Sequence, residues 1–170
     1  MSYTRLLFER RDALAILTFN EPEKRNPFSP TLIDELGDCL GKVAKDKDVL
    51  AVIFTGKGRA FSSGADLRVI QSADPMEDRH EYERVLGMTR LVWNYPKVTL
   101  AAVNGPAFGG GLALACAADI RLAGPEARFC SAFIREEPAL ERPLTWRPRP
   151  ADELRALRSL SGSLPDLSAF

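Results

Sequence analysis

Short continuous apolar runs alternate with helix-period segments over the first 135 positions of the chain. The runs at 49–55 and 98–103 are apolar throughout, which is typical of strands buried on both faces. Two further runs, 6–8 and 13–19, predict a two-stranded start, and 120–122 predicts another short strand.

Helical periodicity separates these runs. Ser29 followed by Pro30 predicts a helix start, with a hydroxyl N-cap before proline at the first helical position. That helix is expected to reach about residue 45, with its apolar face made by Leu32, Ile33, Leu36, Leu40 and Val43. A second helix is expected over 76–95, its apolar side made by Tyr82, Val85, Leu86, Thr89, Val92 and Trp93. Small residues at 112–118 predict a third, so strands and helices alternate as in a parallel-rich α/β domain.

Two glycine-containing turns follow predicted strands. Asn104–Ala115 (NGPAFGGGLALA) has three consecutive glycines before the small-residue helix, and Phe61–Leu67 (FSSGADL) is an upstream turn of the same kind. Glycine lets backbone N–H groups approach a ligand without an intervening side chain. The glycine run alone is compatible with tight helix–strand packing, but two such turns together favour an oxyanion-binding pair of donors.

Composition and charge narrow the function classes. Of the 170 residues, 45% are hydrophobic and 27% charged, and 23 basic side chains balance 23 acidic ones. This zero net charge gives no electrostatic reason to expect nucleic acid or an anionic membrane as partner. Because the apolar run at 13–19 is short, we expect neither a secretory signal nor a membrane span.

Cysteine and histidine usage argues against metal chemistry. Cys39, Cys116 and Cys130 are too far apart for a CxxC pair, so we expect reduced thiols in the core and a cytoplasmic protein. His80 is the only histidine, which excludes a His-cluster metal site, and its polar surroundings predict a surface position.

The composition changes near residue 135. From 136 to 170 lysine is absent, while prolines and arginines crowd together. We therefore expect an α/β core over 1–135 and a divergent tail over 136–170. The tail composition favours a poorly ordered end over a docked one.

Four segments of this chain resemble the enoyl-CoA hydratase/isomerase (crotonase) family, in the family's order and spacing. They are 20–29 (NEPEKRNPFS), 56–67 (GKGRAFSSGADL), 95–123 (YPKVTLAAVNGPAFGGGLALACAADIRLA) and 127–135 (ARFCSAFIR). The resemblance covers residues 3 to about 135. It implies a crotonase-like (ClpP/crotonase) spiral of ββα units that is C-terminally truncated, because full-length relatives continue with further helices.

The resemblance also implies a site. In the family, the backbone N–H groups at the positions of Ala65 and Gly110 form the oxyanion hole for a thioester enolate, and Gly109 is expected to contribute to binding coenzyme A. Lys24 and Arg25 would border the nucleotide of coenzyme A, although either residue is also compatible with a solvated basic turn. Asp66, Leu67 and Arg68 resemble the segment that lines adenine and pantetheine; Asp66 alone is also compatible with a simple helix start.

The acid–base positions depart from the family pattern. Hydratases of the family use two glutamates, and the corresponding positions here are Ala113 and Phe133, which cannot transfer a proton. Glu141 falls where other members carry a catalytic aspartate, in a segment whose glycines are missing here. An exposed charge in the tail is the other interpretation of Glu141.

These observations predict an enzyme of the enoyl-CoA hydratase/isomerase type, a lyase or isomerase, that polarises an acyl-CoA carbonyl. The alternatives are a catalytically impaired CoA-thioester binding protein and a truncated or frame-disrupted relative. Coenzyme A would be part of the substrate, and no separate cofactor is expected. The family assembly, if retained, would be a homotrimer or a dimer of trimers.

Overall fold

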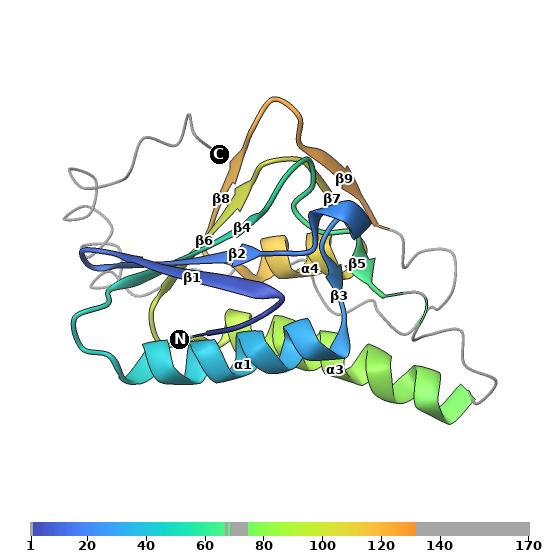
Figure 1. The fold of residues 1–170 in the computed structure, drawn as a ribbon, viewed down its shortest axis with the longest axis horizontal. Helices are drawn as coiled ribbons and strands as arrows, with labels where there is room; N and C mark the ends of the chain where they lie inside the picture. Colours follow the sequence, from blue (N-terminus) through green and yellow to red (C-terminus); the bar gives the residue numbers. More distant parts are fainter. Residues whose placement is uncertain (1, 67, 69–74, 132–170) are drawn as a thin grey trace.

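A five-stranded sheet forms the centre of the molecule, with helices packed against one face (Figure 1). The computed structural model describes residues 2–66, 68 and 75–131. The sheet has the order β1-β2-β4-β6-β8, in which β1 pairs antiparallel with β2 and the other neighbours are parallel. The parallel-rich α/β organisation predicted from the sequence is therefore confirmed.

The helices and strands have the following bounds. The strands are β1 Leu6–Arg11, β2 Leu14–Phe19, β3 Pro27–Phe28, β4 Ala51–Gly56, β5 Gly64–Ala65, β6 Val98–Val103, β7 Pro106–Phe108, β8 Ile120–Ala123 and β9 Arg128–Cys130. The α-helices are α1 Pro30–Lys45, α3 Pro75–Trp93 and α4 Gly110–Ala117, and a 3-10 helix spans Pro22–Lys24.

Helix α1 begins and ends as its sequence predicts. The Ser29 hydroxyl accepts a hydrogen bond from the Leu32 N–H at 3.3 Å, and Pro30 needs no partner for an N–H. All five apolar residues predicted for its inner face are buried, and Cys39 is buried with them. The first helix is thus confirmed in both its bounds and its buried face.

Four short strands form a second layer beside the main sheet. β3 pairs parallel with β5, and β7 pairs parallel with β9. A bridge between Ser62 and Ala107 connects the two pairs. These strands lie together at one end of the molecule, next to α4 (Figure 1).

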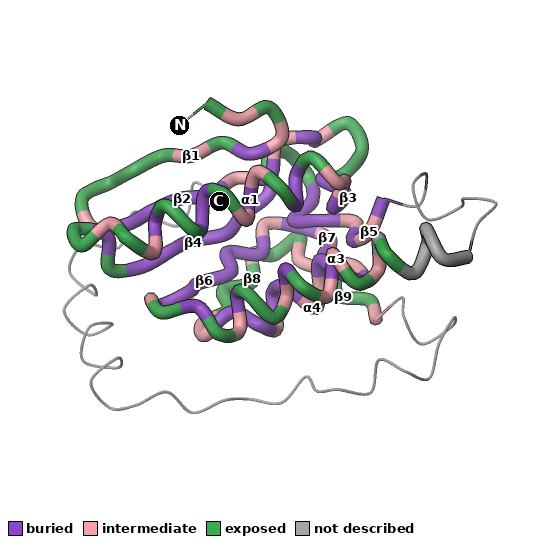
Figure 2. The backbone as a smooth tube through the Cα atoms, turned by 90° about the horizontal axis from the view of Figure 1, so that it is seen from below, coloured by how far each residue is buried: buried purple, intermediate pink, exposed green. Residues whose placement is uncertain are grey.

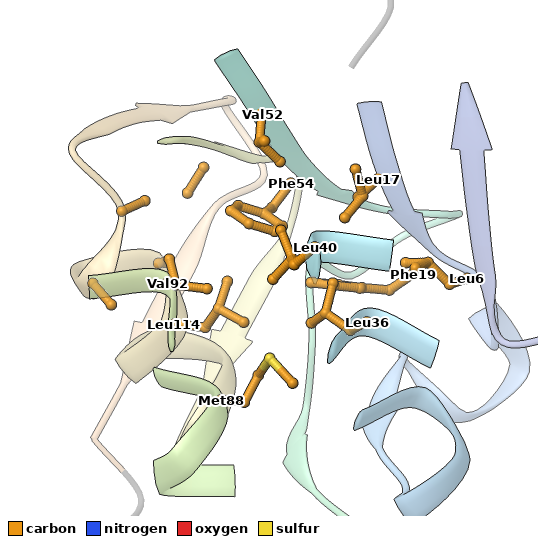
Figure 3. Packing of buried hydrophobic residues seen from close by; sticks show 14 of the residues in the cluster. Leu6, Leu17, Phe19, Leu36, Leu40, Val52, Phe54, Met88, Val92 and Leu114 are labelled. Carbon is orange, nitrogen blue, oxygen red and sulfur yellow. The ribbon is translucent and has the colours of Figure 1, made fainter. Parts of the chain in front are cut away.

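The main core lies between the sheet and the helices. Leu40 of α1 points toward Phe54 of β4, Leu36 lies in the same cluster, and Met88 and Leu114 approach from α3 and α4 (Figure 3). The backbone is buried along β2, β4 and β6 and largely exposed along β1, at one edge of the sheet (Figure 2).

Several predictions needed correction. Met88 is 5% exposed and belongs to the buried face of α3, from which the predicted set omitted it. Of the predicted set, Val85 and Val92 are buried, whereas the others are only half-buried: Tyr82, Leu86, Thr89 and Trp93. Cys130 is exposed on β9 rather than a core residue. Helix α4 begins at Gly110, two residues before its predicted start. His80 is exposed, as predicted.

In the part of the chain that the structure describes, none of the helices is long and apolar enough to cross a membrane.

Candidate functional site

The two glycine-containing turns come together where β5 meets the start of α4. A methyl group added at Gly64 would lie 2.9 Å from the Gly110 amide nitrogen and 2.6 Å from the Phe108 carbonyl oxygen. One added at Gly110 would lie 3.6 Å from the Ala65 amide nitrogen. The backbone amides of Ala65 and Gly110 are therefore neighbours, although the residues are 45 positions apart in the sequence.

The glycines at this contact are required both by their backbone conformation and by the lack of room for a side chain. Gly64 has φ 88° and Gly109 has φ 49°, a region that residues with a Cβ rarely adopt. A methyl group at Gly111 would lie 2.7 Å from the Ser62 carbonyl oxygen. The glycine run thus packs tightly against the upstream turn, and it is this packing that brings the two amides together.

Asn26 anchors the loop between β2 and α1, and the sequence analysis did not single it out. Its side chain is buried, with the amide nitrogen donating to the carbonyls of Lys57 (3.0 Å) and Ala60 (2.8 Å). Its amide oxygen accepts from the Glu21 N–H at 2.9 Å. Asn26 also has φ 54°, a conformation in which Asn is enriched, and this is the signal that an asparagine between Arg25 and Pro27 offered.

Ser62 connects that loop to the turn before β5. Its hydroxyl donates to the Asn26 carbonyl at 2.8 Å and accepts from the Gly64 N–H at 3.1 Å. The next residue, Ser63, donates its N–H to the Arg25 carbonyl at 2.8 Å. These bonds fix the backbone on both sides of Gly64, so Ala65 has a defined position.

Hydrogen bonds of the Asn104 side chain fix the backbone before the second glycine-containing turn. Its side-chain oxygen accepts from the Gly56 N–H at 3.1 Å, and its nitrogen donates to the carbonyls of Gly56 and Gly58 at 2.8 and 2.9 Å. The end of β4 is thereby held against the end of β6. The site therefore lies beyond the carboxyl ends of parallel strands, where α/β sheets usually bind ligands.

An open cavity of about 340 Å³ reaches Ala65, whereas Gly110 is not one of its lining residues. We call it the site cavity; it is lined by Lys24, Pro27, Ser63, Ala65, Asp66 and Arg68. Its size is within the range of small-molecule sites. Loop residues and the β5 turn thus contribute to one concave surface.

Charged side chains in the site cavity are paired. Asp66 is buried and accepts two hydrogen bonds from the Arg68 guanidinium, at 2.9 and 2.7 Å. The hydrogen bonds from the Arg68 side chain hold the pKa of Asp66 below its usual value, against the opposing effect of burial. Lys24 pairs with the buried Glu21, whose carboxylate also lies 3.5 Å from Arg5. Two cations therefore face the cavity, each oriented by a carboxylate.

The structure brings four of the predicted site residues together in one cavity and places Gly110 next to Ala65. Ala65, Asp66, Arg68 and Lys24 line the site cavity. Arg25 is exposed in the same loop but is not a lining residue, and the Gly109 N–H donates to the Cys130 carbonyl at 3.0 Å.

Other predicted positions fall elsewhere. Ala113 is half-buried in the first turn of α4, where its N–H donates to the Gly109 carbonyl at 3.0 Å. Leu67, Phe133 and Glu141 lie outside the described residues.

The sequence of this chain is similar to those of known proteins. Residues 9–136 match a family model described as enoyl-CoA hydratase/isomerase. The chain is 42% identical over 119 residues to the "Putative enoyl-CoA hydratase" of Thermus thermophilus, covering 68% of this chain and 47% of that protein. It is 35% identical over 130 residues to the crotonyl-CoA hydratase of Syntrophomonas wolfei, covering 76% and 50%. The chain thus spans about half the length of the relatives it matches.

Solved structures share the fold. The crystal structure of an enoyl-CoA hydratase from Bacillus anthracis matches with a TM-score of 0.75 at 26% identity, covering 79% of this chain and 53% of that one. A structure of DspI from Pseudomonas aeruginosa matches with a TM-score of 0.75 at 28% identity, covering 95% and 59%. These matches confirm the fold class predicted from the sequence.

Proposed function

This chain belongs to the enoyl-CoA hydratase/isomerase family, and from that premise we propose that it binds an acyl-CoA thioester and polarises its carbonyl. The two donors are the backbone N–H groups of Ala65 and Gly110. The observation that carries the proposal is their adjacency: the Ala65 nitrogen lies 3.6 Å from the point where a Gly110 Cβ would be. Two fixed amides so close together can share one acceptor oxygen.

The position of Gly110 supports its role as a donor. As the first residue of α4, Gly110 has no carbonyl one turn earlier to accept its N–H. No hydrogen bond from this N–H to another described residue is found. The helix dipole also favours negative charge at this end. An enolate oxygen would therefore meet an oriented N–H in a favourable field, worth about 3–4 kcal/mol per donor in comparable sites.

The charged side of the site cavity suits the other end of coenzyme A. Lys24 and Arg68 line it, and Arg25 lies in the same exposed loop. Guanidinium and ammonium groups bind phosphates through charge-assisted hydrogen bonds. Asp66 would keep Arg68 oriented toward the cavity through its two hydrogen bonds. Gly109 contributes by its backbone conformation, which lets α4 begin beside β5.

The proton-transfer step is the part in which this chain departs from two-glutamate hydration. Ala113 lies one turn along α4 from Gly110 and carries no ionisable group. General acid–base catalysis is typically worth 10²- to 10⁴-fold, so hydration without it would be slow. Glu141 remains the candidate acid or base by position in the sequence. A second candidate function, thioester binding without turnover, is favoured by Ala113 and, at the second glutamate position, by Phe133.

One titration tests binding and turnover together. The full chain is titrated with crotonyl-CoA while the heat of binding and the loss of enoyl absorbance are recorded. Heat with loss of absorbance supports an enzyme, and heat with constant absorbance supports the binding protein. Absence of heat at millimolar ligand refutes the proposed function in both forms.

A further inference from the structure

Ser63 provides a polar group in the site cavity that neither the oxyanion pair nor the cations account for. It is half-buried and lines the cavity together with Lys24, Arg68 and Ala65. No hydrogen bond of its hydroxyl is found within the described part of the chain, whereas the hydroxyl of Ser62 makes two. Its backbone N–H is held by the Arg25 carbonyl at 2.8 Å, so the residue itself is fixed.

We propose that the Ser63 hydroxyl hydrogen-bonds the amide of the coenzyme A arm that lies nearest the sulfur. This assignment rests on the proposed function, which places the thioester carbonyl at Ala65 and the phosphates at Lys24 and Arg68. The arm between the diphosphate and the sulfur offers two amides and a hydroxyl as its polar groups. The amide nearest the sulfur is separated from it by two carbon atoms.

The distance between Ser63 and Ala65 and the hydrogen-bonding capacity of a hydroxyl both favour that amide. Ser63 is two residues from Ala65, so their Cα atoms are at most about 7 Å apart. This span matches the separation between a thioester carbonyl and the neighbouring amide. A hydroxyl both donates and accepts, so it can serve either the N–H or the C=O of a neutral amide, whereas an anionic phosphate is better met by the adjacent cations. Ser63 therefore recognises the arm rather than the nucleotide.

Calorimetric titration of the full chain tests this assignment with two probes. The probes are butyryl-CoA and adenosine 3′-phosphate 5′-diphosphate, which is the nucleotide part without the arm. Ser63→Ala is expected to raise the Kd for butyryl-CoA about 3- to 10-fold, the range for one neutral hydrogen bond, and to leave the nucleotide Kd unchanged. Ser63→Thr, which keeps the hydroxyl, is expected to restore butyryl-CoA binding. Ser2→Ala, an exposed serine outside the cavity, is the matched control and should change neither Kd.

The titrations distinguish failure of the Ser63 assignment from failure of the proposed function. Equal butyryl-CoA affinity in Ser63→Ala and the unmodified chain would overturn the assignment while leaving the proposed function intact. A parallel loss for both probes would also overturn it, because the hydroxyl would then serve the nucleotide or the local fold. If the unmodified chain binds neither probe, the proposed function fails, and the assignment fails with it.

Discussion

Gly110→Ala is the substitution that most directly disturbs the proposed pair of donors. The added methyl group would lie 2.8 Å from Val85 Cγ1 and 3.3 Å from Phe28 Cδ2. A valine in a helix has one strongly preferred rotamer, so Val85 cannot turn away without strain. Overpacking of this kind costs about 1–3 kcal/mol of unfolding free energy, which urea denaturation can measure.

The same methyl group should block the thioester. It would lie 3.6 Å from the Ala65 nitrogen, whereas a bound carbonyl oxygen needs to lie about 2.7–3.1 Å from that nitrogen. The oxygen would be displaced from both donors, each worth roughly 0.5–1.5 kcal/mol in binding. We therefore expect calorimetry to give a Kd for butyryl-CoA about 5- to 150-fold higher, with nucleotide affinity unchanged.

Gly41→Ala is the matched control. Gly41 is an exposed residue of α1, and an added methyl group there meets nothing within 4 Å. It should raise the unfolding free energy by up to about 1 kcal/mol through helix propensity and leave both affinities unchanged. If Gly110→Ala binds butyryl-CoA within twofold of the unmodified chain, the carbonyl does not lie between Ala65 and Gly110.

Three further substitutions test the supports of the site and fold. Asn26→Ala leaves the carbonyls of Lys57 and Ala60 without their donor and should cost about 2–5 kcal/mol in urea denaturation; a cost below about 1 kcal/mol would contradict the anchoring role. In Glu35, burial raises the pKa, but hydrogen bonds from Thr4 and Arg5 outweigh it and lower the folded-state pKa below 4.5. The stabilisation from the Glu35 carboxylate is therefore present above the unfolded-state pKa and lost as the pH falls through the folded-state pKa. Glu35→Gln should lower the unfolding free energy at pH 7 and make its decline below about pH 5 less steep. An unchanged dependence of the unfolding free energy on acid pH would refute this. Arg68→Ala removes the main cause of the lowered pKa of Asp66, so carboxyl NMR titration should show that pKa rising, and a constant pKa would show that other groups set it.

The longer elements could be predicted from the sequence because their signals are local. The start signal of α1, Ser29 followed by Pro30, involves only residues of its first turn. The runs at 49–55 and 98–103 indicate buried strands through their own apolar side chains alone. The glycine turns could be identified for the same reason. These features depend on few distant contacts.

The second layer could not be predicted, because its strands are defined by distant partners. β3 and β5 have two residues each, and Pro27 pairs with Gly64 across 37 positions. Met88 was omitted from the inner face of α3 because its burial depends on how that helix lies against α1 and α4. Cys130 looked like a core residue by type, but β9 exposes it.

The candidate site shows the same division. Ala65 and Gly110 could be proposed from paired turns, whereas the roles of Asn26, Ser62 and Asn104 depend on bonds to carbonyls and amides far away in the sequence. The residue type of Asn26 is compatible with its positive φ, but its burial and its bonds to Lys57 and Ala60 depend on the folded loop.

The carbonyl stretching frequency of a bound thioester tests the central claim most directly. Butyryl-CoA labelled with carbon-13 at its thioester carbonyl is bound to the full chain, and the infrared band is compared with that of the free ligand in water. If the Ala65 and Gly110 amides donate to the carbonyl oxygen, the band moves to lower frequency, remains shifted in Gly41→Ala and returns toward the free value in Gly110→Ala. A band that stays at its aqueous frequency in the bound, unmodified chain would contradict the account.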